Sequence, residues 1–245
     1  MKLICLPYAG ASAVIYMKWR RTLGPDFGCV PLELAGRGVR AGEPFYEDMA
    51  EAAEDIAARL VQESGGEPYA VFGHSMGAMI LFEALRLIRD RGLPRPAAIF
   101  FSGRPAPDLA PPEEPIHELP DDAFESRILG MGATSPELFA SEGLRKVFMP
   151  ILRADFRLVA AYRYVEREPL PWAFAVLAGA EEKWTDAEMA GWRRHTTKNC
   201  VIVRMPGGHF YWQQGEGATA LPALLRRELQ QAEWLEMSRV QDSRG

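Results

Sequence analysis

The sequence predicts an α/β fold, in which a mostly parallel sheet is flanked by helices. Short apolar segments bounded by Gly or Pro alternate along the chain with longer segments whose apolar residues recur every three or four positions. The first pattern is typical of buried parallel strands, and the second is typical of amphipathic helices. Strands that alternate with helices are joined by right-handed crossovers, so parallel pairing follows. A stretch without strands, from Pro105 to Leu170, predicts a helical insertion.

The strands and helices of the expected sheet layers can be placed along the chain. A helix is expected over Glu47–Glu63, whose apolar residues form one stripe, and a second helix begins after Ser75 and stops at Gly92. A last helix is expected over about Leu221–Met237, before a frayed polar tail at Ser238–Gly245. The expected strands are Leu3–Leu6, Val30–Leu34, Tyr69–Phe72, Ala97–Ser102, Phe174–Ala178 and Val201–Met205.

The insertion begins with a segment, Pro105–Pro112, whose four prolines exclude regular structure. Helical patterns follow at Asp121–Gly130, Pro136–Ala140 and Gly143–Tyr162. An insertion between two strands, near their carboxyl ends, is placed to cover a site, although it can also serve only to cover the sheet. We expect a single domain over residues 1–245 with a helical lid at about residues 108–168.

Composition limits the partners of the chain. Its 245 residues include 28 Lys and Arg against 33 Asp and Glu, a net charge of −5, which argues against a general nucleic-acid binder. No apolar run approaches the ~20 residues of a membrane span, and the N-terminal run is short and interrupted by Pro7. Cys5, Cys29 and Cys200 have no zinc-like spacing, and Cys5 and Cys200 are expected in the core. A cytoplasmic protein without a metal, membrane or nucleic-acid partner is expected.

The motif Gly73-His74-Ser75-Met76-Gly77 lies between an expected strand and an expected helix. This is the context of a nucleophile elbow, a tight turn that needs small residues on both sides of the serine. The N-terminus of the following helix stabilises negative charge that develops beside the serine. Ser75 is therefore the predicted nucleophile, and His74, inside the turn, is expected to be structural.

A serine nucleophile needs a base and an acid that orients the base. Of the four histidines, His209 lies in the loop directly after the last expected strand, where the order Ser, acid, His places the base. The acid is expected in the loop after Phe174–Ala178, where Glu181, Glu182 and Asp186 compete. Asp186 precedes a helical pattern and can instead be a charge of its first turn.

Two backbone N–H groups are expected to hold the oxyanion. One belongs to Met76, the residue after the nucleophile, and the other to the loop after the first strand. That loop contains the small residues Ala9 and Gly10, which let a backbone amide approach a substrate oxygen. Ala9 is the predicted second donor, with Tyr8 beside it as a wall of the site.

Together these motifs resemble the type II thioesterases, the standalone α/β-hydrolases that accompany modular polyketide and nonribosomal peptide synthetases. That family places its catalytic acid in the pattern Gly-x-x-Asp after the penultimate strand, and Gly179-Ala180-Glu181-Glu182 puts Glu182 at that position, as Glu in place of Asp. Arg153 and Asp155 match the insertion pattern of the family and are expected to be structural. The resemblance covers almost the whole chain and rests on Leu6–Gly10, Pro31–Gly38, Gly73–Gly77, Ser102–Arg104, Leu152–Phe156 and Pro206–Phe210.

The resemblance implies hydrolysis of acyl thioesters on the phosphopantetheine arm of an acyl or peptidyl carrier protein, which removes misprimed or stalled acyl groups. It implies the triad Ser75, His209 and Glu182, no metal or cofactor, and a monomer. The residues alone also allow a small-molecule carboxylesterase or lactonase of the same fold, or a noncatalytic binding protein. Two sets of residues have open roles. Contact with a carrier protein and local ion pairing are both open for Arg37, Arg40 and Arg104. A place along an acyl channel and packing within the lid are both open for Met131, Phe139, Phe148, Met149 and Phe156.

Overall fold

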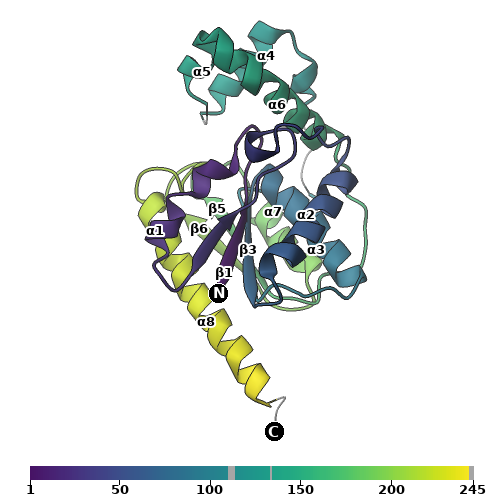
Figure 1. The fold of residues 1–245 in the computed structure, drawn as a ribbon, viewed down its shortest axis with the longest axis vertical. Helices are drawn as coiled ribbons and strands as arrows, with labels where there is room; N and C mark the ends of the chain where they lie inside the picture. Colours follow the sequence, from purple (N-terminus) through teal and green to yellow (C-terminus); the bar gives the residue numbers. More distant parts are fainter. Residues whose placement is uncertain (110–113, 133, 243–245) are drawn as a thin grey trace.

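The computed structural model describes residues 1–109, 114–132 and 134–242, with the side chains of the last helix described as far as residue 233. Its centre is a six-stranded, fully parallel sheet in the order β2-β1-β3-β4-β5-β6 (Figure 1). The α/β fold with a parallel sheet is therefore as expected. The strands are β1 (Lys2–Leu6), β2 (Gly28–Pro31), β3 (Tyr69–His74), β4 (Ala98–Ser102), β5 (Phe174–Gly179) and β6 (Cys200–Met205).

Helices cover both faces of the sheet, and each face has its own apolar core. Helices α2 (Met49–Ser64), α3 (Met76–Asp90) and α7 (Asp186–Ala190) lie on one face, and α1 (Trp19–Thr22) and α8 (Gly217–Asp242) lie on the other (Figure 1). The apolar stripe of α2 is buried against α3 and the sheet, as its periodicity requires. Short 3₁₀ segments occur at Ala13–Tyr16, Gly38–Arg40, Ile116–Glu118 and Gly191–His195.

Two of the expected elements differ from the structure by more than two residues at one end or both. The second strand was expected at Val30–Leu34 but is β2 at Gly28–Pro31, because its ladder with β1 ends at the pair Cys5 and Pro31. The apolar residues after it, Leu32 and Leu34, are buried in a loop and not in a strand. The last helix is longer than expected and continues to Asp242. The prediction of a frayed tail is therefore wrong for residues 238–242. Residues 243–245 lie outside the described part.

The insertion between β4 and β5 contains α4 (Asp121–Gly130), α5 (Pro136–Ala140) and α6 (Glu142–Ala161). These helices stand over the end of the sheet where the strands finish (Figure 1). They share a small apolar core of their own, in which Met149 is buried and Phe139 is packed, so these two candidate channel residues pack inside the insertion. Of the proline-rich segment, residues 105–109 have no regular structure, and residues 110–112 lie outside the described residues.

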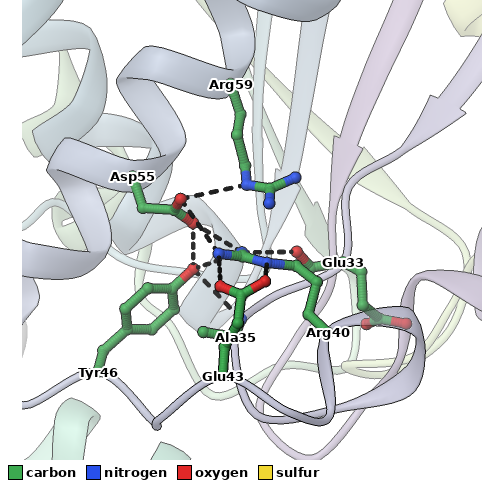
Figure 2. A network of polar contacts seen from close by, with 7 residues as sticks. All are labelled: Glu33, Ala35, Arg40, Glu43, Tyr46, Asp55 and Arg59. Carbon is green, nitrogen blue, oxygen red and sulfur yellow. Dashed lines mark hydrogen bonds and ion pairs between the residues drawn. The ribbon is translucent and has the colours of Figure 1, made fainter.

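A polar network fixes the loop between β2 and α2 (Figure 2). Arg40 is 8% exposed and donates to Glu43 and to Asp55 Oδ2 (2.7 Å), while the Tyr46 hydroxyl donates to Asp55 Oδ2 (2.5 Å). Burial and the Asp55 carboxylate raise the pKa of Tyr46 to about 12. Arg40 is therefore part of a local ion-pair network that fixes the loop, and not a contact for a carrier protein. Arg37, 2% exposed and paired with Asp155, is also a structural residue.

Candidate active site

The nucleophile elbow is formed where β3 ends and α3 begins. Ser75 lies between them with φ 54° and ψ −116°, and no other non-glycine residue in the described ranges has a positive φ. A Cβ atom on Gly73 would lie 2.5 Å from the Gly77 carbonyl oxygen, and one on Gly77 would lie 2.6 Å from the Leu6 carbonyl oxygen. The turn thus excludes side chains at both glycines. Backbone strain of this kind is concentrated at functional sites, where the fold holds one side chain in a set direction.

His209 and Glu182 form a direct hydrogen-bonded pair. His209 Nδ1 lies 2.6 Å from Glu182 Oε1, and the Glu182 side chain is 4% exposed. Trp184 Nε1–H donates to the same oxygen (3.2 Å), and the Gly179 N–H donates to Oε2 (2.7 Å). Because N–H groups surround both oxygens, the carboxylate acts as an acceptor, and Nδ1 of His209 carries the proton. This assignment leaves His209 Nε2 free to accept a proton.

The other two acid candidates do not reach His209. Asp186 begins α7, its side chain is 99% exposed, and its carboxylate lies 3.1 Å from Arg204. Glu181 contributes a backbone N–H bond to the Gly207 carbonyl (3.1 Å). Of the three carboxylates in the loop, the structure brings Glu182 alone into contact with His209.

Ser75 and His209 line the same cavity, of about 310 Å³, at the carboxyl ends of the strands. No hydrogen bond joins Ser75 Oγ to the His209 ring in the part of the chain described here. Such contacts are often loose without substrate and tighten when the reacting group binds. The arrangement can therefore support proton transfer from the serine hydroxyl once a substrate carbonyl occupies the cavity.

The backbone N–H groups expected to hold an oxyanion lie at this cavity. Met76 is the first residue of α3, and Ala9 lines the cavity beside Ser75. Neither N–H has a hydrogen-bond acceptor among the residues described, whereas the neighbouring Gly10 N–H is taken by Asp155 (2.6 Å). Stabilisation of a tetrahedral oxyanion requires two free N–H groups close to the nucleophile.

A buried polar chain supports the elbow from behind. His74 Nδ1 lies 2.8 Å from Ser102 Oγ, which in turn lies 2.8 Å from the Tyr211 hydroxyl. Burial and, secondarily, His209 lower the pKa of His74 well below its usual value, so its ring is neutral. Its ring centre lies 4.8 Å from that of His209. His74 thus has the expected structural place, whereas nothing in the sequence pattern singled out Tyr211.

Most of the cavity wall is apolar, and the insertion contributes part of it. Met131 and Phe156, two of the candidate channel residues, line it, while Phe148 does not. Arg104 also lines the cavity and is 8% exposed. Sequence reasoning missed several further lining residues, which come from the insertion and from the loops after β5 and β6 and are brought together only by the tertiary fold. These are Ile128, Thr134, Leu152, Val159, Trp184 and Phe210.

A family model described as a thioesterase domain matches residues 1–229. The chain belongs to the thioesterase family. The thioesterase PikA5 of Streptomyces venezuelae is 34% identical over 86% of this chain and 75% of that protein. Linear gramicidin dehydrogenase LgrE of Brevibacillus parabrevis is 37% identical over 83% of this chain and 79% of its own length. The crystal structure of ClbQ from the colibactin NRPS/PKS pathway covers 96% of this chain and 98% of its own, with 32% identity and a TM-score of 0.86.

These findings confirm the α/β-hydrolase fold and identify this thioesterase as a hydrolase of thioesters. The word dehydrogenase describes the LgrE protein, whereas a serine elbow with a histidine and a carboxylate is machinery for acyl transfer and not for hydride transfer. No helix in the described part of the chain is long and apolar enough to cross a membrane.

Proposed function

We propose that this thioesterase hydrolyses acyl thioesters on the phosphopantetheine arm of an acyl or peptidyl carrier protein. In this role it removes misprimed or stalled acyl groups during polyketide or nonribosomal peptide biosynthesis. The observation that carries the proposal is that Ser75 and the Glu182-bound His209 line one largely apolar cavity, in a chain of the thioesterase family. The pathway named for ClbQ, which this chain matches almost end to end, supports the setting.

The proposed chemistry has two steps, acylation and deacylation of Ser75. Ser75 Oγ attacks the thioester carbonyl carbon while His209 Nε2 accepts the hydroxyl proton, and the N–H groups of Met76 and Ala9 stabilise the oxyanion. The carbon–sulfur bond then breaks, and the sulfur leaves as a thiolate, which needs little help from an acid because the pKa of its thiol is about 8.5. The thiolate takes the proton from His209, which returns to its neutral form. Water then gives a proton to the neutral His209 and attacks the acyl-serine. The bond between the acyl carbon and Ser75 Oγ breaks, His209 returns the proton to Ser75 Oγ, and the carboxylic acid is released. Glu182 holds the imidazole and stabilises its charged form.

The insertion is proposed to act as a lid over the acyl group. Its side chains Leu152, Phe156 and Val159 line the cavity that also contains Ser75. An apolar wall suits the acyl chain, since burial of apolar surface favours binding. The proposal treats residues 1–245 as one domain that acts as a monomer in the cytoplasm.

The test uses a carrier protein loaded with short acyl groups, with deacylation followed by intact mass. The wild-type chain should remove the acyl group, and Ser75→Ala should not, because the nucleophile is lost. A simple oxygen ester serves as the control substrate. If the carrier stays acylated while the oxygen ester is cleaved, the carrier proposal is wrong and the chain acts as a small-molecule esterase or lactonase.

A further inference from the structure

One carboxylate connects the insertion to the loop that carries the candidate oxyanion donor. Asp155 on α6 is 3% exposed, and its Oδ2 accepts the N–H of Gly10 (2.6 Å). Arg37 grips the same carboxylate with both ends of its guanidinium, at 2.6 Å to Oδ2 and 2.5 Å to Oδ1. Arg37 also donates to the Ala11 carbonyl (3.2 Å). A paired, bidentate and buried carboxylate has a fixed position, so it can hold the Gly10 N–H in a fixed direction.

The loop that Asp155 holds is a tight turn. The Ala11 N–H donates to the Tyr8 carbonyl (3.1 Å), which closes a four-residue turn with Ala9 and Gly10 at its centre. Gly10 has φ +80°, the value that a type II turn requires at its third position. Rotation of the Ala9–Gly10 peptide plane would convert the turn to another type and would take the Gly10 N–H away from Asp155. The hydrogen bond therefore selects the type II turn. The Ala9 N–H belongs to the preceding Tyr8–Ala9 peptide, which enters this turn.

Helix α6 also packs directly on this turn. A Cβ atom on Gly10 would lie 2.3 Å from Leu152 Cδ2, so the helix and the loop leave no space between them. Leu152 and Phe156 of the same helix line the cavity with Ser75. Helix α6 thus contacts both the cavity proposed for the acyl group and the turn at Ala9 and Gly10 that carries the proposed oxyanion donor.

We propose that Asp155, held by Arg37, is a positioning residue for the oxyanion hole. It fixes the Ala9–Gly10 peptide from the insertion, and through the turn it positions the adjoining Tyr8–Ala9 peptide, whose N–H is the second donor, while α6 is seated on the loop. The inference rests on the proposed function, since it takes the Ala9 N–H as an oxyanion donor. A salt bridge with a purely structural role would tie the insertion to the body without affecting the turnover of folded enzyme.

Two double variants separate these roles. Arg37→Met/Asp155→Asn and Arg37→Met/Asp155→Leu both remove the buried ion pair, and their residue-155 side chains are similar in size. Only the asparagine offers an oxygen to the Gly10 N–H. Melting temperatures check that the two are equally folded. Should neither fold, Asp155→Asn and Asp155→Ala are compared instead, with rates scaled to the enzyme that reacts at Ser75 with a fluorophosphonate.

In each pair, the variant with leucine or alanine at position 155 should have a kcat about 10- to 100-fold below that of the variant with asparagine. This loss approaches the ~10²–10³ reduction in rate caused by removal of an oxyanion donor. The KM of the leucine or alanine variant should stay within about threefold, because the contact acts on the transition state. A trifluoromethyl ketone that forms an oxyanion adduct should lose affinity in parallel with kcat. Arg157→Gln is the matched control, because Arg157 also ties α6 to the body, through the Tyr46 carbonyl (3.0 Å), without touching Gly10.

Equal kcat values within a folded pair, or a loss confined to KM, would overturn the inference. An equal loss in the Arg157→Gln control would also overturn it, because general anchoring of the insertion would then explain the effect. Absence of thioester hydrolysis in the wild-type chain, with Ser75→Ala as its reference, would instead refute the proposed function. The two failures are therefore distinguishable.

Discussion

Replacement of Glu182 by glutamine tests the proposed acid with almost no change in shape. In the structure both carboxylate oxygens face donors only: Oε1 accepts from His209 Nδ1–H and Trp184 Nε1–H, and Oε2 accepts from the Gly179 N–H. A glutamine has one acceptor oxygen and one NH₂ group, so it can satisfy only one of the two positions. Either orientation leaves an NH₂ group against a donor.

The size of the effect follows from the two orientations. With the amide oxygen toward His209, the NH₂ group faces the Gly179 N–H, at a cost of about 1–3 kcal/mol, and the imidazolium loses its counter-charge. With the NH₂ group toward His209, the proton moves to Nε2, and the ring can no longer accept the Ser75 proton. The second case resembles an amide replacement in a serine protease triad, which lowers kcat by ~10⁴. We expect kcat/KM to fall by about 10²–10⁴, or about 3–5.5 kcal/mol.

The assay is deacylation of an acyl-loaded carrier protein under single-turnover conditions, repeated with a soluble acyl thioester. Asp186→Asn and Glu181→Gln are the matched controls, because both remove a carboxylate from the same loop without contact to His209. Both should retain wild-type rates within about twofold, as exposed charges contribute little. A Glu182→Gln rate within threefold of wild type, with either control strongly impaired, would refute the assignment of Glu182.

Three further outcomes follow from the same geometry. Trp184→Phe keeps an aromatic side chain, smaller than the indole, but removes the N–H that binds Glu182, so single-turnover rates should fall by about 3- to 10-fold. Gly77→Ala places a Cβ atom 2.6 Å from the Leu6 carbonyl oxygen, so urea unfolding should show a loss of about 1–3 kcal/mol together with a loss of activity. Burial lowers the pKa of His74 in the folded chain. Below the ordinary histidine pKa of about 6.5 the unfolded chain therefore binds a proton that the folded chain does not, and the folded state loses stability as the pH decreases. The free energy of unfolding of His74→Asn, measured between pH 5 and pH 7, should therefore fall less steeply than that of wild type, by up to about 1.4 kcal/mol per pH unit.

The sheet and the elbow could be predicted because their signals are local. Each strand is a short apolar run, and its partner is fixed by the crossover rule and not by a specific side chain. Ser75 lies between glycines that the turn demands, and His209 directly follows a strand. Parallel strands bring their carboxyl ends to one edge of the sheet, so these residues meet without further information.

Contacts of the insertion could not be predicted in the same way. Asp155 lies 145 positions from Gly10 and 118 from Arg37, and no periodic pattern relates them. Arg37 and Arg40 have the composition of a charged surface loop, yet both are buried, because their partners come from helices elsewhere in the chain. Charge alone does not distinguish an arginine that docks a partner from one that fixes the fold.

The loop geometry explains how a glutamate can stand where the family pattern has an aspartate. Glu182 folds back on its own turn: its backbone N–H donates to the Gly179 carbonyl (3.2 Å), and its Oε2 accepts the Gly179 N–H (2.7 Å). This double contact takes up the additional methylene and leaves Oε1 directed at His209, where Trp184 also binds it. The longer side chain gains rotamer freedom in isolation, and the three N–H donors remove that freedom. The Glu182 carboxylate, the proposed acid, is therefore held by the turn as well as by the histidine, which is why its contact with His209 does not depend on a shorter side chain.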